Sequence, residues 1–89
     1  MRDYQITAIR PDPHDADRLI DGLQIEGTIW PIDKVIGWVR SGTHRFWIKV
    51  DEKRVPVIVA RRWMAGRHFL TTEDEGFPPH RLLALRHVR

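Results

Sequence analysis

The residues of this chain best suited to binding chemistry are cationic and aromatic, and they gather in its second half. Residues 45–89 carry ten basic and five acidic side chains, a sum of +5, whereas residues 1–44 carry five basic and seven acidic ones, a sum of −2. Arginine supplies twelve of the fifteen cations, and there are four tryptophans. Because a guanidinium binds phosphate or carboxylate and an indole stacks on flat groups, the pattern predicts a basic aromatic surface. The residues expected to form it are Arg45, Trp47, Lys49, Arg54, Arg61, Arg62, Trp63 and Arg67.

This surface is open to three interpretations. It could bind single-stranded nucleic acid, since stacking of an unpaired base is worth about 1–3 kcal/mol and the cations add salt-dependent phosphate contacts. It could instead be a protein-protein or homodimer interface, because tryptophan and arginine are enriched in interface hot spots. Alternatively, Trp47 packs under a loop or the C-terminal leucines, with arginine stems covering it, and there is no site. We therefore expect a non-catalytic binding module, a monomer or weak homodimer, whose partner is nucleic acid or protein.

Residues that could carry catalysis or hold a metal do not form a recognisable arrangement. Cysteine is absent, which excludes disulfides, thiolate zinc sites and a cysteine nucleophile. The five histidines lack the four-residue spacing of a helical metal site, and the glycines are scattered singly, unlike a phosphate loop. Ser41 is the only serine and is expected to end a helix, while Thr71 or Thr72 is expected to hydrogen-bond the backbone of the following loop. The sequence therefore predicts neither an enzyme nor a cofactor or metal.

The size and hydropathy of the chain favour one small domain. Its 89 residues suffice for a single domain, residues 1–89, with 42% apolar and 30% charged residues as in globular proteins. No apolar run approaches the roughly 20 residues that a membrane helix needs, and no signal-peptide stretch follows Met1. We expect a cytoplasmic protein with no membrane partner.

The elements that must position the basic surface follow from hydrophobic periodicity. Alternation predicts strands over residues 4–9 and about 19–27, separated by a loop over 11–18. A stripe at helical spacing predicts one short helix that starts near Pro31 and stops at Gly42, formed by Ile32, Val35, Ile36 and Val39. Within these elements Tyr4 is expected to wedge into the sheet, and Trp38 to lie at the rim of the core or in solvent.

A hairpin and a last strand complete the expected sheet. The arms span residues 45–51 and 54–60, linked by Glu52-Lys53, so that Trp47 would face Ile58 and Ile48 would face Val57. Residues 69–72 predict a last strand and 73–80 a loop, and residues 86–89 are left as a tail free to fray. The expected fold class is α+β: a mostly antiparallel sheet of about five strands, in the order β-β-α-β-β-β, with one short helix on one face.

Several segments together resemble an uncharacterised, mostly bacterial family catalogued as domain of unknown function 3892. They are residues 4–10, Trp30 before a helix ending at Ser41-Gly42, residues 46–50, residues 69–72 with Asp74, and residues 82–85. The resemblance covers nearly the whole chain through the order and spacing of these segments. The family's pattern has asparagines before the last leucines and a proline after them, where this chain has Pro79-His80-Arg81 and Arg86, so no role of those asparagines is carried over. The resemblance implies a small α+β domain and no activity.

Overall fold

The first strand of this α+β fold, residues 2–11, lies in the middle of the sheet with other strands on both sides. The computed structural model describes residues 2–62 and 66–88, which form seven strands and two helices. In chain order these are β1 (Arg2–Pro11), β2 (Ile20–Ile25), β3 (Thr28–Pro31), α1 (Ile32–Ser41), β4 (His44–Val50), β5 (Lys53–Arg61), β6 (His68–Thr72), α2 (His80–Leu83) and β7 (Arg86–His87). The expected fold class is thus confirmed, with more strands than the five predicted.

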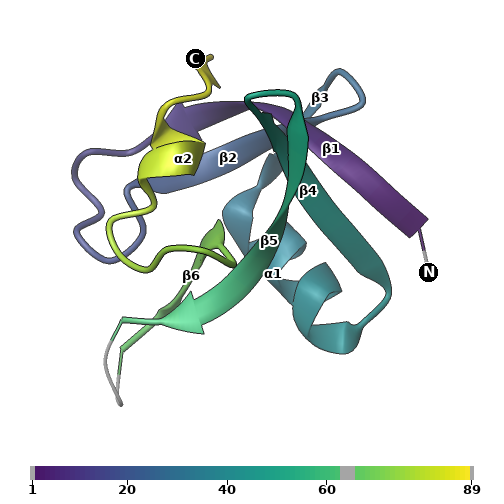
Figure 1. Cartoon of the computed structure of the whole chain (residues 1–89). Coiled ribbons are helices and arrows are strands. Elements are labelled where there is room, and N and C mark those ends of the chain that lie inside the picture. The colour runs from purple at the N-terminus through teal and green to yellow at the C-terminus, as the bar shows by residue number, and fades with distance from the viewer. Residues whose placement is uncertain (1, 63–65, 89) are drawn as a thin grey trace.

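The sheet is mixed, with the strand order β3-β2-β1-β4-β5-β6 (Figure 1). The hairpin pairs β1–β2, β2–β3, β4–β5 and β5–β6 are antiparallel, whereas β4 and β7 both run parallel to β1. β4 is parallel because α1 carries the chain from the β2–β3 side of β1 to its other side. Residues 2–5 of β1 pair with β4, and residues 6–11 pair with β2 after a register shift between Ile6 and Ala8.

The helix α1 lies in the hollow of a curled sheet. It packs against β3 and β6, the two ends of the strand order, and against β2, β4 and β5 between them. A flat sheet could not bring both ends to one helix, so the strands must wrap around α1. Ile32, Val35 and Ile36 are buried, as the stripe predicted, and the Gly42 N–H ends the helix by donating to the Val39 carbonyl at 3.1 Å with φ of 76°.

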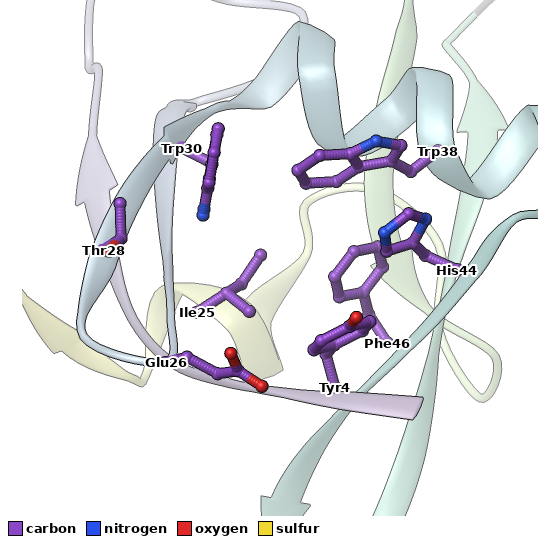
Figure 2. A pocket seen from close by; sticks show the side chains of 8 residues that line it. All are labelled: Tyr4, Ile25, Glu26, Thr28, Trp30, Trp38, His44 and Phe46. Carbon is purple, nitrogen blue, oxygen red and sulfur yellow. The ribbon is translucent and has the colours of Figure 1, made fainter. Parts of the chain in front are cut away.

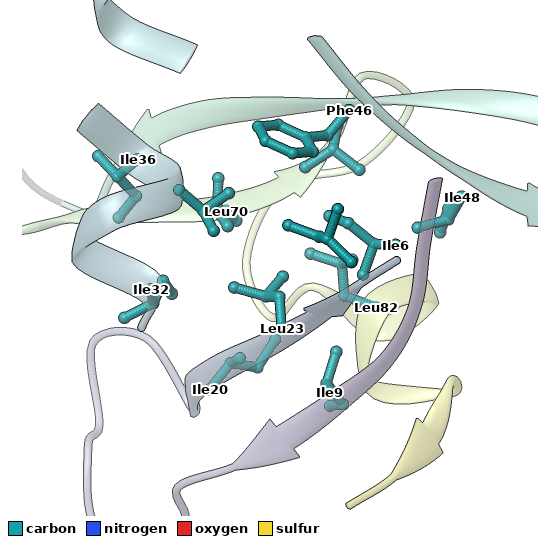
Figure 3. Packing of buried hydrophobic residues seen from close by; sticks show 13 residues of the cluster. Ile6, Ile9, Ile20, Leu23, Ile32, Ile36, Phe46, Ile48, Leu70 and Leu82 are labelled. Carbon is teal, nitrogen blue, oxygen red and sulfur yellow. The ribbon is translucent and has the colours of Figure 1, made fainter. Parts of the chain in front are cut away.

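The core fills the space between the curled sheet and the helix (Figure 3). Ile6, Ile9, Leu23 and Ile48 have no exposed side-chain surface. Each branched or aromatic side chain fully buried there contributes about 1.5–3 kcal/mol, which is what allows a helix of ten residues to persist. The core thereby fixes which residues of β1 and β4 point inward and which point to solvent.

The β4–β5 hairpin differs from the predicted register by two residues. The structure pairs Ile48 with Val55 and Trp47 with Pro56, because the two-residue turn is Asp51-Glu52 rather than Glu52-Lys53. Both turn residues have positive φ, 49° and 68°, as in the primed turns that match strand twist. A shift of two keeps every side chain on its predicted face, so the apolar and basic faces survive although the pairing was wrong.

The remaining differences lie at the strand ends. The second predicted strand stops at Ile25, because Glu26 and Gly27 have positive φ and turn the chain into β3. The tail expected to fray over 86–89 instead contains β7, and the Val88 N–H donates to the Ile9 carbonyl at 2.8 Å. Arg89 lies outside the described residues. Within the described residues, neither helix is long and apolar enough to cross a membrane.

Candidate functional site

The hairpin part of the predicted basic surface faces solvent. Arg45, Lys49 and Arg54 are exposed, and Ile58 on the same face is 36% exposed. Most of these cations already have partners: Arg45 Nε lies 3.2 Å from Asp3 Oδ1, and Lys49 Nζ lies 3.4 Å from Glu52 Oε2. The face is therefore accessible, but its net positive charge is small.

Trp47, the predicted stacking platform, is half-buried and partly covered. The Arg54 guanidinium carbon lies 4.3 Å from the centroid of the Trp47 ring system, within cation–π range. A hollow of about 180 Å³ lies beside it, lined by Asp3, Arg45, Phe46, Trp47, Arg54 and Pro56. A base could stack on this indole only after displacing Arg54 or from the side of the hollow.

The other predicted residues do not extend this face. Strand alternation turns Arg61 to the opposite face of β5 from Arg54, since the two are seven residues apart. Arg62 lies over the Phe77 ring at 3.7 Å, and Arg67 Nη1 lies 3.3 Å from Asp15 Oδ2. Trp63 lies outside the described residues. The structure therefore brings together the residues of the hairpin and gives Arg61, Arg62 and Arg67 other surroundings.

An aromatic pocket lies on the other face of β4. It has a volume of about 270 Å³ and is lined by Tyr4, Ile25, Glu26, Thr28, Trp30, Trp38, His44 and Phe46 (Figure 2). Five of these eight residues carry rings. The structure shows a concentration of aromatic surface here, on the side of the sheet that faces α1.

The rings form walls at two orientations. Trp30 and Trp38 meet edge to face, with centroids 5.2 Å apart and planes at 69°. His44 stacks on Trp38 at 4.5 Å and on Tyr4 at 5.3 Å. Phe46, which is only 3% exposed, lies behind them and ties the pocket to the core. Packing among rings in these geometries adds about 0.5–1.5 kcal/mol per pair and holds the walls in place.

Four separate elements supply the walls, and the sheet register brings them together. Parallel pairing of β1 with β4 sets Tyr4 beside Phe46, and strand alternation puts His44 on the same face as Phe46. The tight turn at Glu26-Gly27 folds β3 back so that Trp30 reaches the same space. Trp38 comes from α1, near the end that Gly42 caps.

Charged groups stand at the rim of the pocket. Figure 2 shows the Glu26 carboxylate turned toward the space between Ile25 and Tyr4. Arg2 Nη1 donates to the Tyr4 hydroxyl at 3.4 Å, and this bond, with the charges of Tyr4 and Glu26, raises the pKa of Arg2. Lys34 Nζ lies 5.5 Å from the centroid of the Trp38 ring system. The rim therefore carries one carboxylate and two cations, and cations already approach the rings.

The polar side chains that line the pocket with a hydroxyl, carboxylate or imidazole are Tyr4, Glu26, Thr28 and His44. The Thr43 hydroxyl is 2.8 Å from His44 Nδ1, but Thr43 is exposed and does not line the pocket. Among the residues the structure describes, no three histidine, aspartate or glutamate side chains gather closely enough to hold a metal ion. The ring walls can contact a ligand group from several sides.

Sequence reasoning missed this pocket. Tyr4 was expected as a wedge in the sheet, and Trp38 at the rim of the core or in solvent. The structure instead stacks Tyr4 on His44 and packs Trp38 against Trp30. The available signal was that Trp30 comes just before the predicted helix and Trp38 lies within it, shortly before His44 and Phe46. That signal does not indicate the parallel pairing of β1 with β4, which places Tyr4 in the pocket wall.

Comparison with known proteins adds no assignment. No family model, no curated protein and no solved structure matches this chain. The resemblance to the family of unknown function therefore stays a prediction, and function has to be argued from the site itself.

Proposed function

We propose that this protein is a non-catalytic binding module and that the aromatic pocket is its main ligand site. The observation that carries the proposal is a pocket of about 270 Å³ lined by eight residues, of which five carry rings and one is Glu26. Ligand sites are typically concave and mostly apolar, with a few polar groups that set orientation. At this size the pocket suits a small organic group, either free or presented by a larger partner.

The test is a titration of the ¹⁵N-labelled protein with three probes of different chemistry: indole, adenosine and choline. We expect at least one probe to shift the amide signals of Tyr4, Trp30 and His44 in a saturable way. Trp30→Ala should abolish these shifts, because it removes a half-buried wall on the edge strand β3. Trp47→Ala, on the opposite face of β4, is the matched control and should leave them unchanged. If no probe shifts the pocket signals, the proposal is wrong.

A second candidate is binding of single-stranded nucleic acid by the outer face of the β4–β5 hairpin. The hollow beside Trp47 favours it, because a ring and the cations Arg45 and Arg54 line the same space. Two of the exposed cations on this face are ion-paired, so only a few phosphates should be neutralised. The affinity should then fall with salt at a log–log slope of roughly −1 to −2, at about 0.7 per phosphate for single strands.

The experiment for the second candidate is fluorescence anisotropy with a labelled oligothymidylate over a range of salt. Trp47→Ala should weaken binding while circular dichroism shows that the domain stays folded. Glu52→Gln should strengthen it, since Lys49 loses its carboxylate partner. A complex that tolerates salt, or a dimer seen by sedimentation, would instead support the protein-interface interpretation. Unfolding of Trp47→Ala would show that the indole serves the scaffold.

A further inference from the structure

We propose that the aromatic pocket recognises a methylated or quaternary ammonium group, with Glu26 as its counter-charge. This inference rests on the proposed function and names the ligand chemistry of the same site. It follows from the orientation of the walls and from the charge that the rings and Glu26 present. Each of these is a property of the described residues.

The walls surround a compact group better than a flat one. Trp30 and Trp38 stand at 69° to each other, so a planar base stacked on one would meet the edge or face of the other (Figure 2). His44 already fills the place between the roughly parallel rings of Trp38 and Tyr4, at 4.5 and 5.3 Å. A rounded group of tetrahedral shape can touch several differently oriented rings at once. Crossed walls therefore favour an alkylammonium head over a nucleobase.

The ring faces and the Glu26 carboxylate present negative potential to such a head, and the rim cations Arg2 and Lys34 oppose it. Ring faces carry the negative part of the aromatic quadrupole, and tryptophan is the strongest cation–π partner. The Glu26 carboxylate adds a full negative charge at the mouth of the pocket. Lys34 Nζ lies 5.5 Å from the Trp38 ring centroid, within cation–π range, at the i, i+4 spacing of α1.

Methylation suits this site better than a bare ammonium. A primary ammonium is strongly hydrated and brings three N–H donors, each of which needs an acceptor once water is removed. Among the lining side chains, the carboxylate of Glu26 is the one charged acceptor. Methyl groups need no hydrogen bonds, spread the charge over a larger surface and pack against the rings. We therefore expect affinity to rise with the number of methyl groups.

A substitution of Arg2 can test whether the ligand of the pocket is a cation or an anion. It donates to the Tyr4 hydroxyl and interacts with Glu26, so it partly neutralises the rim. Replacing Arg2 with glutamine should strengthen binding of a cation, by roughly two- to fivefold for an exposed charge in high dielectric. The same change should weaken binding of an anionic ligand such as a nucleotide. The direction of this effect distinguishes the two ligand classes.

The experiment compares choline with 3,3-dimethylbutan-1-ol, its uncharged carbon isostere, by NMR titration of the whole chain. We expect choline to bind roughly tenfold more tightly, which is the cation–π preference for a partly desolvated site. Glu26→Gln should remove several-fold of the choline affinity and leave the alcohol unchanged. The matched control is Glu52→Gln, the same substitution in the two-residue turn Asp51-Glu52, away from the pocket.

The outcomes separate this inference from the proposed function. Equal binding of choline and its isostere, or tighter binding of adenosine, overturns the ammonium inference and leaves the pocket as a ligand site. No binding of any probe overturns both. A peptide carrying trimethyllysine, compared with the same peptide carrying lysine, tests the source of the group. Preference for the trimethylated peptide over choline supports a protein partner, and the reverse supports a free small molecule.

Discussion

The hydrogen bond of the Thr71 hydroxyl joins β6 to the loop over residues 73–79, and its contribution to the free energy of unfolding should be measurable. Thr71 is 1% exposed, and its Oγ1 donates to the Gly76 carbonyl at 2.7 Å. The loop passes over the outer face of β6, where Phe77 packs edge-on against Phe69 at 5.3 Å. Thr71→Val keeps the shape of the side chain and removes the donor, so the Gly76 carbonyl loses its protein partner.

The expected loss is about 1 kcal/mol in the free energy of unfolding. An intramolecular hydrogen bond contributes about 0.5–1.5 kcal/mol net, and Gly76 is exposed enough for water to replace part of the bond. For a domain of this size the loss corresponds to a fall in Tm of about 4–8 °C. Urea unfolding followed by far-ultraviolet circular dichroism measures the free energy, and a thermal scan measures Tm.

The matched control for this prediction is Thr7→Val. Thr7 is an exposed strand threonine whose hydroxyl makes only long contacts to Gln24, at 3.3 and 3.4 Å. Its substitution should change stability by less than about 0.5 kcal/mol, as surface changes do. If Thr71→Val proves as neutral as Thr7→Val, the hydroxyl does not hold the loop and the reasoning fails.

Three further predictions concern pH and the β4–β5 turn. The Thr72 hydroxyl donates to Asp74 Oδ1 at 2.7 Å and lowers the pKa of Asp74. The ionised Asp74 therefore stabilises the fold at neutral pH, and this contribution is lost as pH falls below 3.8 through the folded-state pKa. Urea midpoints of wild type and Thr72→Val should differ most at pH 7 and converge in acid. Burial is the main cause that lowers the pKa of His68, and the charges of nearby arginines lower it further. The wild type should therefore lose stability as pH falls below 6.5. Thermal scans of His68→Gln should show a smaller change in Tm between pH 7.5 and 5. Glu52→Gly relieves a φ of 68° at the loss of an exposed ion pair with Lys49, and should raise the free energy of unfolding by about 0.5–1 kcal/mol in urea titrations.

Features with a local signal could be predicted from the sequence. The helix stripe and the left-handed stop at Gly42 lie within ten residues of one another, and the structure has both. The faces of the β4–β5 hairpin were also predicted correctly, because alternation alone assigns them. The turn was not, since Asp51, Glu52 and Lys53 include no glycine or asparagine that would favour one pair for positive φ. Thr71 or Thr72 was expected to bond the loop backbone, and the bond of Thr71 to the Gly76 carbonyl confirms this.

The pocket could not be predicted because its signal is not local. Tyr4 and His44 are forty residues apart, and only the parallel pairing of β1 with β4 brings them to one space. Sequence periodicity reports which face a side chain takes, but it does not report which strands are neighbours. The predicted surface failed as one continuous patch for a related reason: Arg61 takes the face opposite to Arg54, and Arg62 and Arg67 bind local partners.

Side chains of β4 contribute to both candidate surfaces. Along β4, His44 and Phe46 point into the pocket, and Arg45 and Trp47 point to the outer face. Phe46 is held in the core, and a one-residue slip of β4 would bury Arg45 or Trp47 in its place, at a cost of several kcal/mol for a charge. The core therefore fixes which side chains of β4 face each surface, and a ligand on one surface does not need to contact a ligand on the other.

This arrangement makes the two proposals independent in experiment. The two sites share Phe46 and otherwise take their β4 side chains from opposite faces, and the β4 backbone is held by pairing on both sides. The effects of Trp30→Ala and Trp47→Ala on stability should then add within about 0.5 kcal/mol. The effect of each on binding should be confined to its own surface. A coupling larger than this would mean that the sheet shifts as a unit, and that occupancy of the pocket is felt at the basic face.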